Sequence, residues 1–215
     1  MTSASNEHFW RDSALRQEAE GYQWRNASHG RGKTLDTRAD PHAPKGFVFH
    51  RTGGLVVKRR VELQEDMLYR FAAKKYVGSG ANALVPLLNS PWWMNDDRMM
   101  LLLGRARSAG VPLVEIARRQ LALPPAWTDC DIIVRARLRP GVLIAAHAGP
   151  GRTAEANGDS YTIAPEAPHL LIDQLYIPGL GRHFALNGAG EPHARAWFDL
   201  STATSFDPAL RGLNP

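Results

Sequence analysis

The sequence has a single cysteine, Cys130, which excludes an internal disulfide and favours a reducing compartment of action. No apolar run approaches the roughly 18 residues that span a membrane, so we expect no membrane partner. Residues 1–7 lack the basic-then-apolar pattern of a signal peptide, and no cleaved signal is expected. The histidines at 147, 169 and 183 stand apart, without the close spacing of zinc ligands, so no metal site is expected.

The composition is that of a globular protein, with 44% hydrophobic and 22% charged residues in a chain of 215. Residues 1–60 hold 11 Lys/Arg and 6 Asp/Glu, whereas residues 61–215 hold 15 of each. The net positive charge therefore belongs to the first part of the chain, which argues against a basic nucleic-acid face on the rest. We interpret residues 1–60 as a basic N-terminal extension and linker, and residues 61–215 as the main domain.

Hydrophobic periodicity predicts two helices in the middle of the chain, at 96–109 and 112–121, with strands on both sides. The expected strands lie at 47–50, 54–58, 67–71, 131–138, 142–148, 169–177, 184–186 and 196–200. This arrangement predicts an α+β fold with a mainly antiparallel sheet and two central helices.

Arg70 lies beside Tyr69 within an apolar strand. An arginine in this setting can donate two hydrogen bonds to a phosphate or a ribose, and it stays charged at any working pH. The alternative is that the side chain reaches solvent at the edge of a sheet.

The segment Ser90-Pro91-Trp92-Trp93 places two indoles side by side after a proline. Adjacent residues of a strand point to opposite faces, so one indole can belong to the core while the other stacks on a nicotinamide or adenine ring. The alternative is that both indoles are core residues.

Gln174 and Tyr176 share one face of the strand expected at 169–177, and Asp173 points to the other face. A glutamine can bind ribose hydroxyls, and its carbonyl oxygen can stabilise an oxocarbenium-like state, less strongly than a carboxylate would. The alternative is a polar strand face beside solvent. Cys130 is interpreted as a buried thiol rather than a nucleophile.

The order of these segments resembles the ADP-ribosyltransferase superfamily, and in particular its toxin-type branch in bacterial secreted effectors, some of which only hydrolyse NAD. The resemblance covers about residues 62–186 and implies an ADP-ribosyltransferase-like fold built on a split, mainly antiparallel sheet, with NAD as the substrate and no metal.

The resemblance also implies a role for each matching residue. Arg70 would hold the diphosphate or the nicotinamide ribose, and Gln174 would stand beside the ribose as the bond to nicotinamide breaks. The remaining residues expected to contact NAD are Tyr69, Ser90, Trp92, Trp93 and Tyr176.

One departure from the family pattern affects the expected reaction. Most members that modify proteins have a glutamate where Gln174 or Tyr176 falls, and Asp173 or Glu166 replaces it only if the strand register differs. The missing carboxylate favours NAD glycohydrolysis, or transfer to an unusual protein or nucleic-acid acceptor, over arginine-directed transfer.

The resemblance further implies a secreted effector without a cleavable signal peptide, used in interbacterial competition. It would act in the cytoplasm of the target cell, with a cognate immunity protein as partner; otherwise the chain is expected to be cytoplasmic. Two other readings stay open. One is a non-catalytic α+β module that binds a partner, and the other is a nuclease or RNA-modifying toxin using the basic N-terminal arm and the histidines.

Overall fold

The computed structural model describes residues 4–6, 22–26, 47–51, 59–121, 123, 128–151, 154–156, 159–161, 171–180 and 193–209. The strands are β1 Ala4–Ser5, β2 Tyr22–Asn26, β3 Phe47–Arg51, β4 Arg59–Gln64, β5 Met67–Ala72, β6 Trp92–Asn95, β7 Ile132–Leu138, β8 Val142–Pro150, β9 Ala154–Ala156, β10 Asp159–Tyr161, β11 Asp173–Tyr176 and β12 Phe198–Phe206. The helices are α2 Val85–Leu88, α3 Asp96–Ala109, α4 Leu113–Gln120 and α5 His193–Trp197, with short 3-10 helices at Lys74–Tyr76 and Gly80–Asn82.

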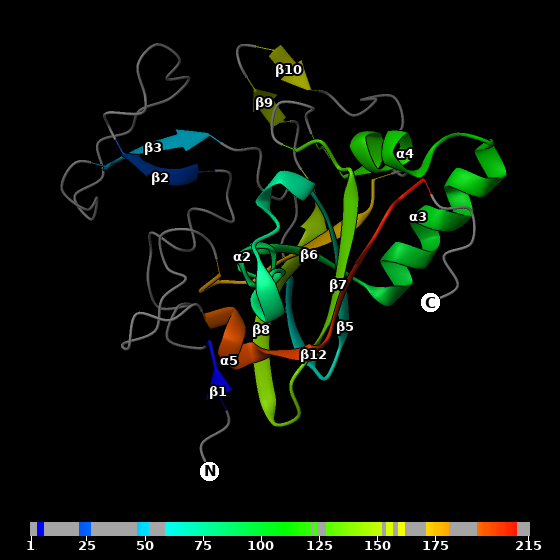
Figure 1. Cartoon of the computed structure of the whole chain (residues 1–215). Helices are drawn as coiled ribbons and strands as arrows, with labels where there is room; N and C mark the ends of the chain where they lie inside the picture. Colours follow the sequence, from blue (N-terminus) through cyan, green and yellow to red (C-terminus); the bar gives the residue numbers. More distant parts are fainter. Residues whose placement is uncertain are drawn as a thin grey trace.

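In the described part of the chain, eight strands form the main sheet, in the order β1-β8-β11-β6-β5-β7-β12, with β4 paired to β8. Every pairing in this sheet is antiparallel except that of β1 with β8. Figure 1 shows α3 and α4 together on one side, away from α2 and α5. The structure is therefore α+β with a mainly antiparallel sheet and few helices, as the sequence predicted.

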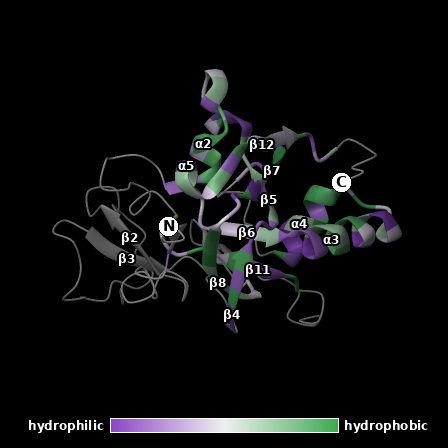
Figure 2. Cartoon of the chain, turned by 90° about the horizontal axis from the view of Figure 1, so that it is seen from below, coloured by the Kyte–Doolittle hydropathy of each residue, from purple (hydrophilic) through white to green (hydrophobic). Residues whose placement is uncertain are grey.

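The sheet is covered on both faces. One hydrophobic cluster joins β5, β7, β8 and β11 to residues of α2 and α5, with Leu88 and Trp197 among them. A second cluster joins the opposite face of the sheet to α3 and α4, with Leu102 and Ala117 among them. Strand β8 is mostly hydrophobic along its length (Figure 2), as expected for a strand with buried residues on both faces.

Helix α3 has the boundaries that the sequence predicted, and α4 differs by one residue at each end. The Asn95 side chain accepts a hydrogen bond from Arg98 N at 3.2 Å and so caps the start of α3. Asp96 and Asp97 occupy the first turn, where the helix dipole favours negative charge. The helix ends at Gly110, whose φ of 64° is readily adopted by glycine.

The last predicted strand is partly wrong. Ala196 and Trp197 belong to helix α5, and the strand begins at Phe198 and continues to Phe206. The His193 and Trp197 rings stack at 5.1 Å, a contact that the i, i+4 spacing of a helix permits.

Strand 47–50 is confirmed, but its partner is β2. The predicted strands at 54–58 and 184–186, and residues 169–170, lie outside the described residues. The strand predicted at 169–177 is shorter in the structure, because β11 covers Asp173–Tyr176 and residues 171, 172 and 177 are not in a strand.

Of the described strands before β4, β1 joins the main sheet, whereas β2 and β3 pair with each other in a separate two-stranded sheet. Strand β1 pairs with Val142 and Leu143 of β8, and the boundary expected at residue 60 falls within β4. In the portion of the chain that the structure describes, no helix has the length and apolar character needed to cross a membrane.

Candidate functional site

The three strands expected to carry the site are neighbours in the sheet. The first two residues of β6 pair with β11, and its last two pair with β5. In this register Trp93 lies opposite Leu175, and Met94 lies opposite Tyr69. Although β5 and β11 are far apart in the sequence, only β6 separates them.

The expected site residues divide between the two faces of the sheet. Arg70 and Trp93 project toward α2, because Arg70 contacts Leu87 O and Trp93 belongs to the cluster that includes α2. The residues that alternate to the other face are Tyr69, Trp92, Gln174 and Tyr176. The structure therefore brings four of the expected residues onto one face and places Arg70 on the other.

Arg70 is a largely buried cation. Its Nη1 donates a hydrogen bond to Leu87 O at 2.5 Å, and its Cζ lies 5.9 Å from the centre of the Trp93 ring. Its Nε is buried without a hydrogen-bond partner, and no carboxylate of the described residues pairs with it. Burial lowers the pKa of Arg70 to about 10 from 12.5, because desolvation disfavours the charged form.

The Ser90-Pro91-Trp92-Trp93 segment is held by its own hydrogen bonds. The indole Nε1 of Trp93 donates to Ser90 O at 2.6 Å, and Trp92 N donates to Ser90 Oγ at 3.3 Å. Trp93 is only 1% exposed and packs on the ring of Phe198. Trp93 is thus the core indole of the pair, and the Ser90 hydroxyl stabilises the turn.

Gln174 is 7% exposed, and its Nε2 donates to Leu121 O at 2.6 Å. Leu121 is the C-cap residue directly after α4, so this bond satisfies a carbonyl that the helix leaves unpaired. The Gln174 side chain therefore connects β11 to α4, and its Oε1 accepts no hydrogen bond from the described residues.

Tyr176 is fully buried, with aromatic neighbours on its face of the sheet. The Trp92 ring meets it edge-on at 5.1 Å, and the His147 ring lies 6.2 Å away. Trp92 is partly exposed, unlike Trp93. The partly exposed indole lies on the same face as Gln174.

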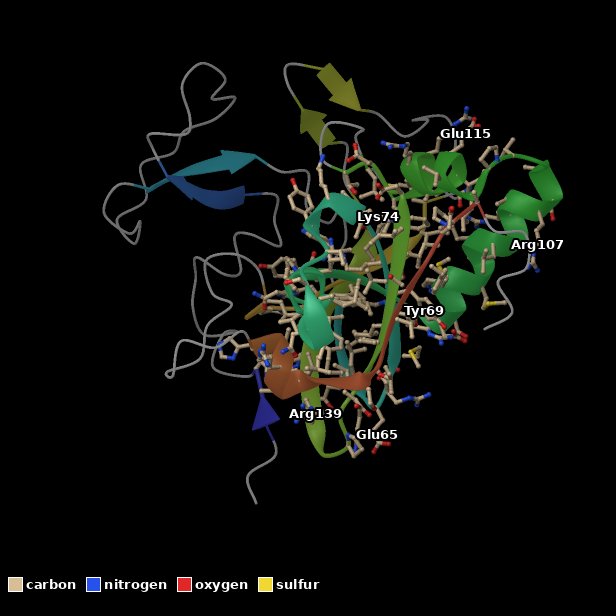
Figure 3. All side chains as sticks on the ribbon, viewed as in Figure 1. Glu65, Tyr69, Lys74, Arg107, Glu115 and Arg139 are labelled. Atoms are coloured by element: carbon tan, nitrogen blue, oxygen red, sulfur yellow. The ribbon has the colours of Figure 1, made fainter. Side chains whose placement is uncertain are left out.

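Tyr69 lies where β5 faces α3 (Figure 3). Burial raises the pKa of its phenol above 10.0, and a hydrogen bond and the negative charge of Asp96 raise it further. Arg135 opposes this effect, because its positive charge favours the phenolate. A buried phenol between an acid and an arginine is a polar site within the second cluster.

Comparison with protein-family models, curated proteins and solved structures found no match to this chain.

The structure adds an ionic cluster at the start of β11 that the sequence did not reveal. The Oδ2 of Asp173 accepts from Arg59 Nη2 at 3.1 Å and lies 3.5 Å from Arg98 Nη2. The three residues come from β11, β4 and α3, so no local spacing in the sequence could have indicated the cluster. Among the described residues, this cluster holds two arginines and one aspartate.

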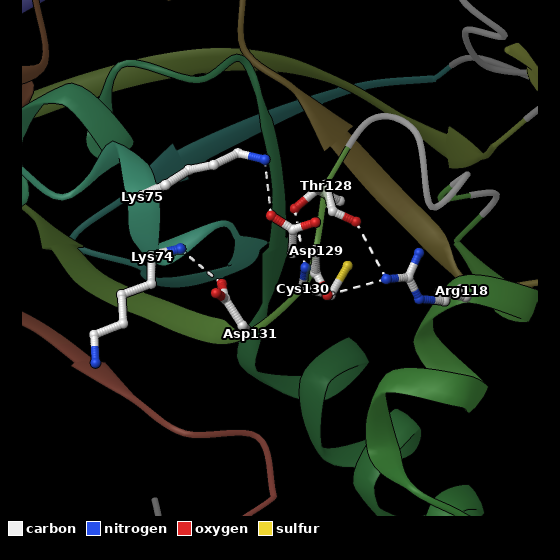
Figure 4. Close-up of polar contacts among 7 residues, drawn as sticks. All are labelled: Lys74, Lys75, Arg118, Thr128, Asp129, Cys130 and Asp131. Atoms are coloured by element: carbon white, nitrogen blue, oxygen red, sulfur yellow. Dashed lines mark hydrogen bonds and ion pairs between the residues drawn. The ribbon is translucent and has the colours of Figure 1, made fainter. Parts of the chain in front are cut away.

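Cys130 is confirmed as a buried thiol. Burial is the main cause that raises its pKa above 9.0, and the positive charge of Arg118 opposes that rise. Figure 4 shows Arg118 donating to the backbone oxygens of Thr128 and Asp129, and Lys75 paired with Asp129 at 2.8 Å. These contacts tie the chain before β7 to α4 and to the turn after β5.

The described parts of the chain hold no group of three His, Cys, Asp or Glu residues that could bind a metal ion. His147 stands on β8, and His169 and His183 lie outside the described residues. The residues that the sequence singled out for the site include a buried cation, a hydrogen-bonding amide and aromatic rings.

Proposed function

We propose that this chain is an NAD-cleaving enzyme of the ADP-ribosyltransferase type, breaking the bond between nicotinamide and ribose. The observation that carries the proposal is the adjacency of β5, β6 and β11. These strands hold Arg70, the tryptophan pair and Gln174, the three features on which the resemblance rests. The two halves of the sheet meet at β6, in keeping with the split sheet that the resemblance implies.

Arg70 supports the proposal because its charge is kept in the protein interior without a compensating acid among the described residues. A buried cation is costly unless an anion pairs with it. A phosphate of NAD has the charge and the acceptor oxygens that the free Nε could use.

The reacting centre belongs in this proposal to the face that carries Gln174 and Trp92. Water attacks C1′ of the nicotinamide ribose, the C–N bond breaks, and nicotinamide leaves with the bonding electrons; the water proton goes to solvent. The Gln174 Oε1 stabilises the positive charge that develops on the ribose. Trp92, partly exposed beside Tyr176, offers a surface on which a flat ring can stack.

The positions of Arg70 and Gln174 set a strict condition on this mechanism. Since the two side chains project from opposite faces of the sheet, one dinucleotide would have to reach both faces to contact Arg70 and Gln174 together. Gln174 in place of a carboxylate favours water as the acceptor over an arginine side chain. The proposal extends to an effector that acts in the cytoplasm of a target cell and is neutralised by an immunity protein.

A second candidate is a non-catalytic module that binds a protein partner. The burial of Gln174 and Tyr176 favours this second candidate, because the Gln174 amide already donates a hydrogen bond to Leu121 O and Tyr176 is fully buried. In that case both residues stabilise the fold and no NAD turnover is expected.

The test measures NAD loss and nicotinamide release with purified full-length protein. We compare the unchanged chain with Arg70→Ala and Gln174→Ala, and with Gln64→Ala as the control, because Gln64 is an exposed glutamine on strand β4. The proposal expects turnover that is lost in Arg70→Ala, is at least about tenfold lower in Gln174→Ala, and is unchanged in Gln64→Ala. No turnover and no NAD binding by the unchanged chain would reject the proposal and leave the partner-binding module.

A further inference from the structure

Asn6 is a fully buried polar residue near the N-terminus. Its Nδ2 donates to Ala145 O at 2.7 Å and to Pro178 O at 2.9 Å. Its Oδ1 accepts from Ala145 N at 2.8 Å. Both side-chain atoms are thus bonded to backbone groups of segments more than a hundred residues away.

The Asn6 side chain extends the hydrogen-bond pattern that the backbone of β1 forms with β8. Strand β1 pairs in parallel with Val142 and Leu143 of β8. Two residues further along β8, the Asn6 amide donates to and accepts from Ala145, as a paired backbone residue would. The N-terminal segment therefore lies along the edge of β8 that β11 occupies beyond His147.

The second bond of Nδ2 reaches the turn that ends β11. In this turn Ile177 N donates to Pro91 O at 2.8 Å, and Leu180 N donates to Ile177 O at 3.3 Å. Gly179 adopts a φ of 94°, which favours glycine. The turn is thus fixed by the segment before β6 on one side and by Asn6 on the other.

We propose that Asn6 is a positioning residue that clamps the end of β11 to β8 and so sets the orientation of the strand carrying Gln174. The consequence for catalysis rests on the proposed function; the clamp itself does not. Asn6 contacts no reacting group in this proposal and acts through the Pro178 turn.

The chemistry of the amide makes the clamp specific. Alanine would leave Ala145 N, Ala145 O and Pro178 O buried without their partner. Aspartate keeps the size and can still accept from Ala145 N, but its ionised oxygens would face the two carbonyl oxygens. Asn6→Asp is therefore expected to release the turn at least as strongly as Asn6→Ala at neutral pH.

The test follows amide hydrogen exchange of the full chain in Asn6→Ala and Asn6→Asp. Asn82→Ala is the control, because Asn82 is an exposed asparagine in a 3-10 helix. We expect exchange about tenfold faster within 143–148 and 174–180, the factor for one lost net hydrogen bond, with β5 and β7 unchanged. Unchanged exchange at 174–180, or equally faster exchange throughout the sheet, would overturn the clamp.

Turnover provides the second readout, with NAD as the probe. A positioning role predicts a lower kcat in both Asn6 variants with little change in KM, and no change in Asn82→Ala. Faster amide hydrogen exchange at 174–180 with an unchanged kcat would show that Asn6 holds the turn without affecting the reaction. That result would overturn the positioning role. If the unchanged chain does not turn over NAD, the proposed function fails, and hydrogen exchange alone decides whether the clamp exists.

Discussion

Replacing Arg70 by methionine tests whether the charge of Arg70 binds a ligand or stabilises the fold. Methionine retains an unbranched apolar side chain and removes the cation. Lowering the pKa of Arg70 from 12.5 to about 10 corresponds to about 3 kcal/mol of unfavourable desolvation at neutral pH. Removing the charge relieves this cost.

Two favourable contacts are lost in the same substitution. The charge-assisted hydrogen bond to Leu87 O contributes about 1.5–3 kcal/mol, and the contact with the Trp93 ring contributes about 0.5–1 kcal/mol. Gain and loss nearly cancel, so the free energy of unfolding of Arg70→Met is expected to stay within about 1 kcal/mol of the unchanged chain.

The measurement is urea unfolding followed by tryptophan fluorescence, with and without NAD. Arg139→Met is the matched control, because Arg139 is exposed and donates to Phe198 O at 2.9 Å. This control loses one hydrogen bond without relief of desolvation, so it is expected to lose about 1 kcal/mol. NAD should stabilise the Arg139 variant and fail to stabilise Arg70→Met. A loss above about 3 kcal/mol in Arg70→Met would refute the reasoning and make the residue a structural one.

Three further outcomes follow from the structure. Asn95→Ala removes the cap of α3 and should cost about 1 kcal/mol of unfolding free energy in the same urea assay; an unchanged midpoint would contradict the cap. Since its raised pKa disfavours the thiolate, Cys130 should be alkylated more slowly in the folded chain than in urea at pH 8, and equal rates would show an accessible thiol. The raised pKa of Tyr69 stabilises the fold below pH 10, and this contribution is lost as the pH rises through the folded pKa. Tyr69→Phe should therefore lose less stability than the unchanged chain as the pH rises above 10, and parallel curves would reject that coupling.

The sequence predicted those elements whose pattern is local and long. Helix α3 has apolar residues at helical spacing, two aspartates in its first turn and a glycine directly after its last turn, so its boundaries could be predicted. The short apolar run at 196–200 lacks a comparable set of sequence signals. A strand and a helix fit it equally well, and only packing against the sheet selects the helix up to Trp197.

The same limit applies to the candidate site. The two-residue period of a strand correctly placed Gln174 and Tyr176 on a common face. It could not show that Arg70 faces the other way, because that depends on how β6 pairs with two different strands. Nor could it indicate that Leu121 O would engage Gln174, since helix α4 and strand β11 are distant in the chain.

The pairing of β6 has a consequence for the order in which the chain can fold. Strands β5 and β7 and helices α3 and α4 are complete by Leu138, so one half of the sheet can form while the rest is still being synthesised. Until β11 has been synthesised, the first half of β6, with Trp92 and Trp93, has no strand to pair with and forms an open edge of the sheet. Such an edge is prone to association between chains. Pro91, which has no N–H, immediately precedes this edge and shortens the strand that a second chain could join. Nascent chains that stop before Asp173 are therefore expected to associate through this tryptophan edge, and chains that include β11 are not.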